Sequence, residues 1–152
     1  MENLQERNAN FFRFEGLRIY GKAVDYSTWL IKTLADPQKE TEKNLYNSFC
    51  HSAYDIALNI AEGSSRTKSQ FDHYLKISKT AIRECVVYTA IAEGTGLMNA
   101  DQVENSRELL MELTRMIGAL IISLQKGSSR RREEDMLDSV DTDFNTDFSD
   151  LS

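Results

Sequence analysis

The stretch of sequence that decides the fold is residues 67–96, TKSQFDHYLKISKTAIRECVVYTAIAEGTG. Thr67 and Gln70 predict a capping box, in which each side chain accepts a hydrogen bond from the other residue's backbone N–H. Small or apolar residues then recur at spacings of 4, 3, 4, 3, 4 and 3, namely Phe71, Leu75, Ser78, Ile82, Cys85, Thr89 and Ala92. This heptad pattern predicts one long helix that buries a continuous seam and ends at Gly94-Thr95-Gly96.

A second apolar stripe runs beside the seam of this helix. Its members are Tyr74, Ile77, Ala81, Tyr88 and Ile91. A helix that faces a single neighbour does not need so wide an apolar surface. We therefore expect the helix either to be central in the fold or to contact another subunit.

Three further helices are predicted on either side of this one. A first helix, starting near residue 16 and ending near Ala35, would bury Leu17, Tyr20, Val24, Ile31 and Leu34. Asp36-Pro37 would end it and begin the second helix, whose buried positions are Leu45, Phe49, Ala53, Ile56 and Ile60. The second helix would end at Gly63, where a left-handed turn is expected. Asn99 and Gln102 predict the cap of a fourth helix, with Val103, Leu110, Leu113, Ile117, Leu120 and Leu124 buried. The predicted helices are joined by short connections, which make sequential helices antiparallel. We therefore expect an all-α, up-down-up-down four-helix bundle.

Charge divides the chain into a nearly neutral bundle and an acidic tail. The whole chain carries −6, and residues 127–152 hold 8 acidic and 3 basic side chains, or −5, which leaves −1 for residues 1–126. We expect residues 1–13 to be a flexible lead-in, residues 14–126 to form the bundle, and residues 127–152 to be a disordered acidic tail. The bundle and the tail must therefore be interpreted separately.

Several functional classes lack their sequence signals. The longest apolar run, residues 118–124, is too short for a membrane span, and no signal-peptide pattern starts the sequence, so we expect a cytoplasmic protein without a membrane partner. Cys50 and Cys85 are far apart in sequence and are predicted to be small buried residues. Neither Glu-x-x-His, for a di-metal bundle, nor a nucleotide-binding glycine loop occurs, and His51 and His73 lie on different helices. We expect no cofactor, no metal and no enzymatic activity.

The segment Asn59-Ile60-Ala61-Glu62-Gly63-Ser64-Ser65-Arg66 resembles the signature of the ribosomal-RNA intervening-sequence proteins. These proteins are encoded in insertions of large-subunit rRNA genes in some bacteria. Supporting similarities are Phe14, Leu17, Ile19 and Tyr20 before the signature, and Phe71, Tyr74, Leu75, Ile77, Ser78 and Glu84 after it. The resemblance covers roughly residues 14–125.

The resemblance implies a homopentamer of four-helix bundles with a non-enzymatic role. Similarity to the accessory variability proteins of retroelements implies an accessory or nucleic-acid-associated scaffold. For the polar signature residues Asn59 and Glu62, we favour a structural role, with hydrogen bonds to the following turn or to Arg66, over direct contact with a ligand.

Two other groups of residues are candidate binding sites. Lys76, Lys79 and Arg83 share one face of the third helix, and Arg66 and Lys68 stand at its start, so together they could bind a nucleic-acid backbone, RNA or DNA. The alternative is a solvated helix face. In the tail, Phe144, Phe148 and Leu151 stand among aspartates. They could bind a protein partner, which would make the chain a protein–protein adaptor, or they could compete with nucleic acid for the basic face of the same oligomer. The alternative is a tail that only improves solubility.

Overall fold

The chain forms four long α-helices and one short 3₁₀-helix. The computed structural model describes residues 11–34 and 37–150, except for the side chains of residues 128–132, 135 and 138–150. The elements are the 3₁₀-helix η1 (Arg13–Gly16), then α2 (Arg18–Thr33), α3 (Glu40–Ser64), α4 (Lys68–Thr95) and α5 (Ala100–Asp150). No strand occurs within the described residues. The predicted all-α class with four helices is therefore confirmed.

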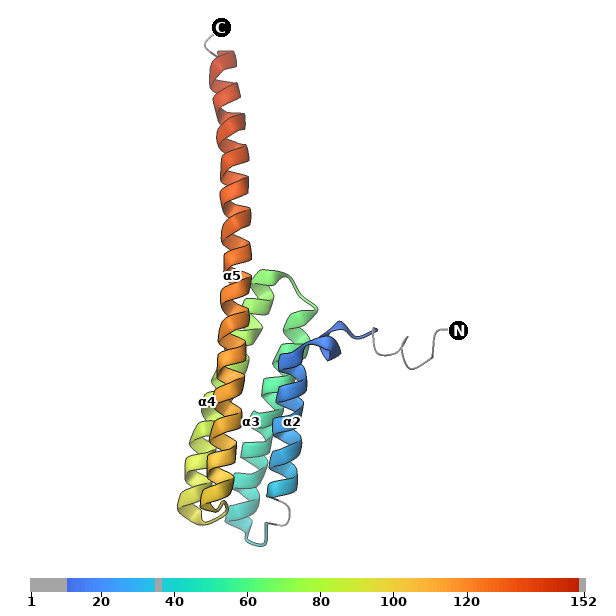
Figure 1. The fold of residues 1–152 in the computed structure, drawn as a ribbon, viewed down its shortest axis with the longest axis vertical. Helices are drawn as coiled ribbons and strands as arrows, with labels where there is room; N and C mark the ends of the chain where they lie inside the picture. The colour runs from blue at the N-terminus through green and yellow to red at the C-terminus, as the bar shows by residue number, and fades with distance from the viewer. Residues whose placement is uncertain (1–10, 35–36, 151–152) are drawn as a thin grey trace, which may run out of the picture.

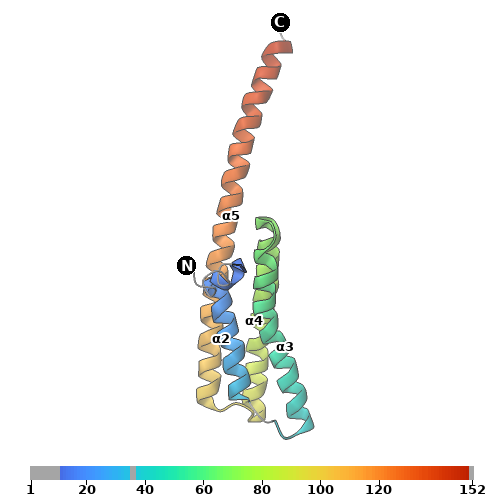
Figure 2. The same ribbon diagram turned by 90° about the vertical axis from the view of Figure 1, so that its right-hand side faces the viewer.

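The four helices lie side by side and are joined by short connections. Figures 1 and 2 show the path: α2 descends, α3 returns upward, α4 descends behind, and α5 rises past the top of the others. Contacts between helices follow the same course. Tyr26 of α2 hydrogen-bonds Ser106 of α5, and Ser52 of α3 donates a hydrogen bond to Glu84 of α4.

The core is formed by the side of α4 that the heptad spacing marks. Every member of that seam is buried except Phe71, which is half-buried. Cys50 and Cys85 are both buried free thiols, as predicted. The second stripe is divided: Ala81 is buried, Tyr88 stacks on Phe49 of α3 with ring centroids 5.7 Å apart, and Ile77 and Ile91 remain more than one-third exposed. Only part of the second apolar stripe of α4 is therefore buried or packed against α3, and the rest of it remains exposed.

The predicted buried face of the first helix is wrong at two of its five positions, because Val24 and Ile31 are 37% and 38% exposed. Leu34 is buried as predicted, and Leu17 and Tyr20 pack half-buried against the core. The buried positions within α2 are Ile19, Ala23, Tyr26, Ser27 and Leu30. The physical reason is that Tyr26 enters the core with its hydroxyl satisfied by Ser106 at 2.8 Å, which turns the helix away from Val24.

The glycine predicted to end the second helix is also used differently. Gly63 lies inside α3, which continues to Ser64, and only Gly96 among the described glycines has a positive φ, of 78°. Gly63 is required for close packing, because a Cβ there would stand 2.6 Å from Tyr74 Cβ and 2.9 Å from Phe71 Cδ2. Gly96 caps the end of α4 in the left-handed conformation, within the Gly94-Thr95-Gly96 segment that was predicted to end that helix.

The start of α3 differs from the predicted one. Pro37 is not helical, and α3 begins at Glu40, where Glu42 Oε2 accepts hydrogen bonds from the backbone N–H groups of Gln38 and Lys39. A carboxylate three residues into the helix therefore supplies the cap that we assigned to Asp36-Pro37. Asp36 itself lies outside the described residues.

Both predicted capping boxes form. Thr67 and Gln70 exchange hydrogen bonds of 3.3 Å at the start of α4, and Asn99 and Gln102 exchange bonds of 2.9 Å at the start of α5. Each pair satisfies two backbone N–H groups that the helix leaves without partners.

Replacing Asn99 with alanine is expected to lower the free energy of unfolding by about 1 kcal/mol, because the cap acceptor is lost. Asn105→Ala is the matched control, since Asn105 is exposed within α5 and alanine there raises helix propensity by a few tenths of a kcal/mol. Urea midpoints of the two variants measure the difference. Equal midpoints would contradict a stabilising role for the Asn99 cap.

The last helix continues beyond the bundle, where the sequence predicted a tail without regular structure from residue 127. Here α5 runs as one helix from Ala100 to Asp150. After Gly127 the sequence contains neither Gly nor Pro, and residues 130–135, RRREED, place opposite charges three and four apart. Extending an existing helix also needs no new nucleus. Most of the predicted lead-in, residues 1–10, lies outside the described residues.

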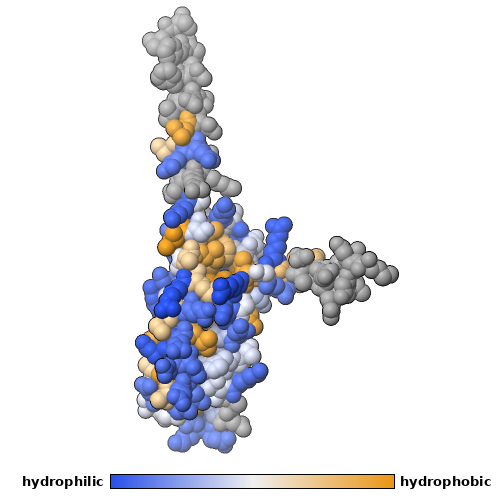
Figure 3. Space-filling view, viewed as in Figure 1, coloured by the Kyte–Doolittle hydropathy of each residue, from blue (hydrophilic) through white to orange (hydrophobic). Residues whose placement is uncertain are grey.

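The surface of the bundle is largely hydrophilic, with one apolar area in the view of Figure 3. Apolar atoms gather in the upper part of the bundle, between α5 and the upper end of α3, above the start of α2. With 16 residues, α2 is shorter than α3 with 25, so it leaves this part of the bundle uncovered. None of the helices, over the part of the chain that the structure describes, has an apolar stretch sufficient to cross a bilayer.

Candidate nucleic-acid interface

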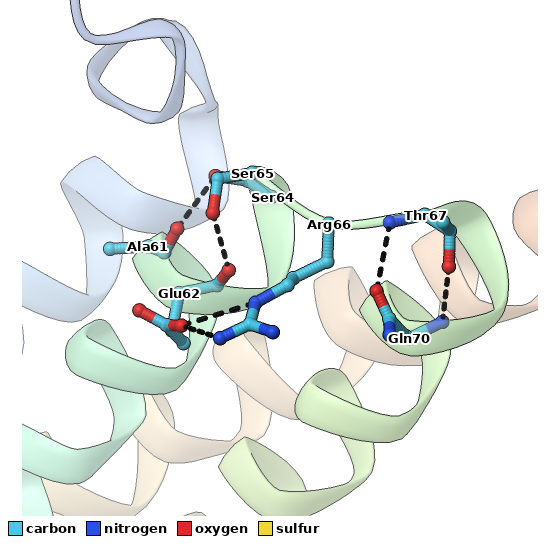
Figure 4. Close-up of polar contacts among 7 residues, drawn as sticks. All are labelled: Ala61, Glu62, Ser64, Ser65, Arg66, Thr67 and Gln70. Atoms are coloured by element: carbon cyan, nitrogen blue, oxygen red, sulfur yellow. Dashed lines mark hydrogen bonds and ion pairs between the residues drawn. The ribbon is translucent and has the colours of Figure 1, made fainter.

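The signature segment forms the end of α3 and the turn into α4 (Figure 4). Glu62 receives hydrogen bonds from the Arg66 guanidinium, one of them from Nε to Oε1 at 3.2 Å. The Arg66 guanidinium also lies 5.6 Å from the centroid of the Tyr74 ring. The hydrogen bond to Glu62 raises the pKa of Arg66. An ion pair and a cation–π contact therefore hold the turn against α4.

The other signature residues are also engaged within the protein. Asn59 Nδ2 donates to the Asp55 carbonyl at 2.8 Å, within the same helix. Ile60 is fully buried, and Ala61 accepts a hydrogen bond from Ser64 through its carbonyl. Gly63 allows the close approach of α4. In this structure the contacts of the signature serve to set α3 against α4.

Glu84 makes a second polar link between these two helices. Its Oε2 accepts a hydrogen bond of 2.7 Å from the Ser52 hydroxyl, which is buried. Glu84 and Ser52 border an open cavity of about 470 Å³, to which His51 and Tyr88 also contribute. His51 Nε2 lies 4.0 Å from Asp55 Oδ2. No group of three or more potential metal ligands occurs among the described residues.

The candidate cationic residues of α4 share one side of the helix. Lys68, Lys76, Lys79 and Arg83 are separated by 8, 3 and 4 residues, which places them along a single face. We call these four residues the α4 basic face. Lys68, Lys76 and Arg83 are exposed, and Lys79 is half-buried. One acidic residue, Asp72, lies on the same side and pairs with Lys76 at 3.0 Å. The face therefore carries a formal charge of 4 − 1 = +3.

The structure does not bring Arg66 together with the α4 basic face. Arg66 is bound to Glu62 and lies against Tyr74, two residues before Lys76 and so on a different side of α4. In contrast, no carboxylate among the described residues forms an ion pair with Lys68, Lys79 or Arg83. Within the described part of the chain, Lys68, Lys79 and Arg83 are therefore the cations of the α4 basic face that have no carboxylate partner, whereas Arg66 is bound to Glu62 in the turn.

The tail residues that we singled out cannot be placed as a site. Phe144 and Phe148 belong to the helical extension of α5, in the part whose side chains are not described, and Leu151 lies outside the described residues. The hydrogen bond from Ser52 to Glu84 and the contact of Arg66 with Tyr74 were missed by the sequence reasoning. Arg66 and Tyr74 are eight residues apart, a spacing with no local rule that would have indicated a contact across the turn.

A family model described as 23S rRNA-intervening sequence protein matches residues 15–119. The match begins in η1 and ends within α5, so it contains the signature, the α4 basic face and nearly all of the core. It excludes the extension of α5. Among curated proteins, none matches the chain.

Proposed function

The chain belongs to the 23S rRNA-intervening sequence protein family, and on that basis we propose that it is a non-catalytic, self-associating scaffold that binds nucleic acid in the cytoplasm. The α4 basic face is the observation that carries this proposal. Among the described residues, three of its cations have no carboxylate partner, and they lie along one helix side from Lys68 to Arg83, a length of about 22 Å. Such an array suits a row of phosphates.

The chemistry of the face favours contact with the backbone over base reading. Lysine provides a flexible point charge, whereas reading a base edge requires fixed, paired donors and acceptors. The face has no aromatic side chain for base stacking, because Phe71, His73 and Tyr74, which stand between Lys68 and Lys76 in the sequence, project from other sides of the helix. We therefore expect binding that depends strongly on salt and little on sequence.

The antiparallel arrangement of the bundle and its self-association are the second part of the proposal. The pairs Ser52–Glu84 and Ile56–Ser78 support antiparallel α3 and α4, because a higher residue number in α3 meets a lower one in α4. The pairs Tyr26–Ser106 and Lys22–Glu112 support the same arrangement of α2 and α5. Exposed apolar residues on one side of α4, Ile77, Val87 and Ile91, support contact with another copy. The pentamer is proposed from the family resemblance.

The absence of catalysis is proposed from the state of the reactive groups. Ser52 is only 4% exposed and donates its hydrogen to Glu84, so it is not placed to attack a substrate. Burial raises the pKa of the Cys50 and Cys85 thiols, which keeps them protonated and unreactive. Tyr26, Thr89 and Ser106 form a closed hydrogen-bonded chain inside the core.

Neutralising two cations of the α4 basic face tests the nucleic-acid proposal. We expect Lys68→Gln/Arg83→Gln to weaken binding of a mixed single-stranded RNA pool about tenfold at about 50 mM salt. The slope of log affinity against log salt should become shallower by about 1.4, corresponding to two lost phosphate contacts. Fluorescence anisotropy at about 50 and 200 mM salt measures both quantities.

The matched control is Lys32→Gln/Lys43→Gln, which removes two exposed cations from α2 and α3 and changes the net charge equally. It should keep RNA affinity within about twofold. If both double variants lose the same affinity, or if the unaltered protein retains no RNA at low salt, the α4 basic face is not a nucleic-acid site.

A protein–protein adaptor is the second candidate function. It is favoured by the −5 charge of residues 127–152 and by their position outside the family match. Under this alternative, the chain does not bind RNA at either salt concentration, and Phe144→Ser/Phe148→Ser abolishes capture of a protein partner.

A further inference from the structure

An apolar groove lies between α2 and α3, outside the α4 basic face. Val24 and Ile31 of α2 line one wall, and Tyr54 and Leu58 of α3 line the other. The groove holds about 370 Å³. Leu58 is 62% exposed, the largest exposed fraction among these four side chains. A groove of this character fits an apolar helix side.

A buried hydroxyl in this groove lacks a hydrogen-bond partner. Ser27 lines the groove, is 9% exposed, and its Oγ makes no hydrogen bond in the structure. Leaving a buried hydroxyl unpaired costs roughly 1–3 kcal/mol. The Oγ atom itself is covered by the protein, so it is not a contact point for an occupant. The groove therefore presents an almost wholly apolar surface.

The extension of α5 has the sequence of a helix that binds in such a groove. Leu137, Val140, Phe144 and Phe148 follow one another at spacings of 3, 4 and 4, which places them on one side of the helix. Leu137 is 66% exposed. The eight residues from Leu137 to Phe144 and the eight residues from Val24 to Ile31 each extend about 10 Å along their helices.

The direction of α5 indicates that the extension meets the groove of a second copy of the chain. As one continuous helix, α5 carries its extension away from its own bundle (Figures 1 and 2), so the extension does not meet its own α2 and α3. The two walls differ in charge, because α2 carries a net charge of 3 − 1 = +2 and α3 carries 1 − 4 = −3. The extension carries −5 over residues 127–152. Charge therefore favours contact of the extension with the α2 wall of the groove.

We propose that the α5 extension of one copy binds in the α2/α3 groove of another copy, with Leu137, Val140 and Phe144 against Val24, Ile31 and Leu58. This contact rests on the proposed self-association and adds the α5 extension to the contact proposed for α4. Because the extension lies outside the family match, it would be a contact added to the shared bundle.

Disulfide trapping between two full-length variants tests the contact. One chain carries Leu58→Cys, and the other carries Phe144→Cys and a mass tag. Cys50 and Cys85 are buried and do not compete. Under mild oxidation we expect the mixed disulfide dimer to exceed, about fivefold or more, that of the control pair Thr80→Cys with Phe144→Cys. Thr80 is exposed on α4, away from the groove.

Two outcomes would overturn the proposal. One is equal trapping by the test and control pairs. The other is an intramolecular disulfide in a dilute chain that carries both Leu58→Cys and Phe144→Cys, which would place the extension on its own bundle.

A second variant separates this contact from nucleic-acid binding. Leu58→Asp should lower the molar mass measured by light scattering or raise the dissociation concentration about tenfold, while RNA affinity of the α4 basic face is retained. Unchanged association of Leu58→Asp would refute the groove contact and leave the nucleic-acid proposal standing. Loss of RNA binding in Lys68→Gln/Arg83→Gln with trapping intact is expected if the two sites are independent.

Discussion

Replacing Gly63 with alanine is expected to destabilise the protein by about 2 kcal/mol, although alanine favours a helix more than glycine does. The added Cβ would meet Tyr74 Cβ at 2.6 Å and Phe71 Cδ2 at 2.9 Å. Tyr74 Cβ is fixed to the backbone of α4, so α3 and α4 must move apart to relieve the overlap. Overpacking of this kind costs typically 1–3 kcal/mol and exceeds the gain of about 1 kcal/mol in helix propensity.

Gly21→Ala provides the matched control. Gly21 lies within α2, is exposed, and has no atom within 4 Å of the position of an added Cβ. This variant should be more stable than the unaltered protein by about 0.5–1 kcal/mol. The two substitutions therefore have opposite signs in chemical denaturation. A stabilised Gly63→Ala would show that α3 and α4 do not need the glycine for their close approach.

The two glycines show which features of the fold can be predicted from sequence. Capping at Thr67–Gln70 and the end of α4 at Gly94-Thr95-Gly96 depend on residues within one turn, and both were predicted correctly. Gly63 also stands near a helix end, and for that reason we interpreted it as a stop signal. Its real partners, Tyr74 and Phe71, come from the next helix, and only their packing reveals why a side chain is excluded.

The phase of a helix is harder to predict where the core contains polar groups. For α4, the unbroken heptad spacing indicated the correct side, because its seam of small and apolar residues is continuous. For α2, the spacing that includes Val24 and Ile31 was as regular as the spacing of the residues that are buried in the structure. Tyr26 is the buried residue that decides between them, and its partner Ser106 is 80 residues away.

The candidate nucleic-acid interface could also be predicted from the sequence only in part. The spacing of Lys68, Lys76, Lys79 and Arg83 places them on one face of any helix, and the structure leaves that description unchanged. Arg66 differs, because Glu62 stands four residues before it and binds it in the turn. The groove between α2 and α3 depends on the relative placement of two helices, and the burial predicted for Val24 and Ile31 concealed it.

Raising the pH from 9 to 11 is expected to lower the free energy of unfolding by about 4 kcal/mol. Burial is the main cause that raises the pKa of Cys85 far above its ordinary 9.0, and the charge of Glu84 adds to it. Burial likewise raises the pKa of Tyr26 far above its ordinary 10.0. Above those ordinary values the unfolded chain loses protons that the folded chain keeps, so alkaline pH favours unfolding. Each group contributes about 1.4 kcal/mol per pH unit, over about two units for Cys85 and one for Tyr26.

Single substitutions separate the two contributions to this pH dependence. Cys85→Ala should remove about 1.4 kcal/mol per pH unit from the slope above pH 9, and Tyr26→Phe the same amount above pH 10, whatever each does to stability at pH 7. Tyr26→Phe also breaks the hydrogen-bonded chain through Ser106 and Thr89, so its stability at neutral pH should fall by about 1 kcal/mol. Urea unfolding followed at pH 7, 9, 10 and 11 yields both numbers. A slope that neither substitution changes would mean that the pH dependence arises outside these two groups and that Tyr26 and Cys85 reach solvent in the folded protein.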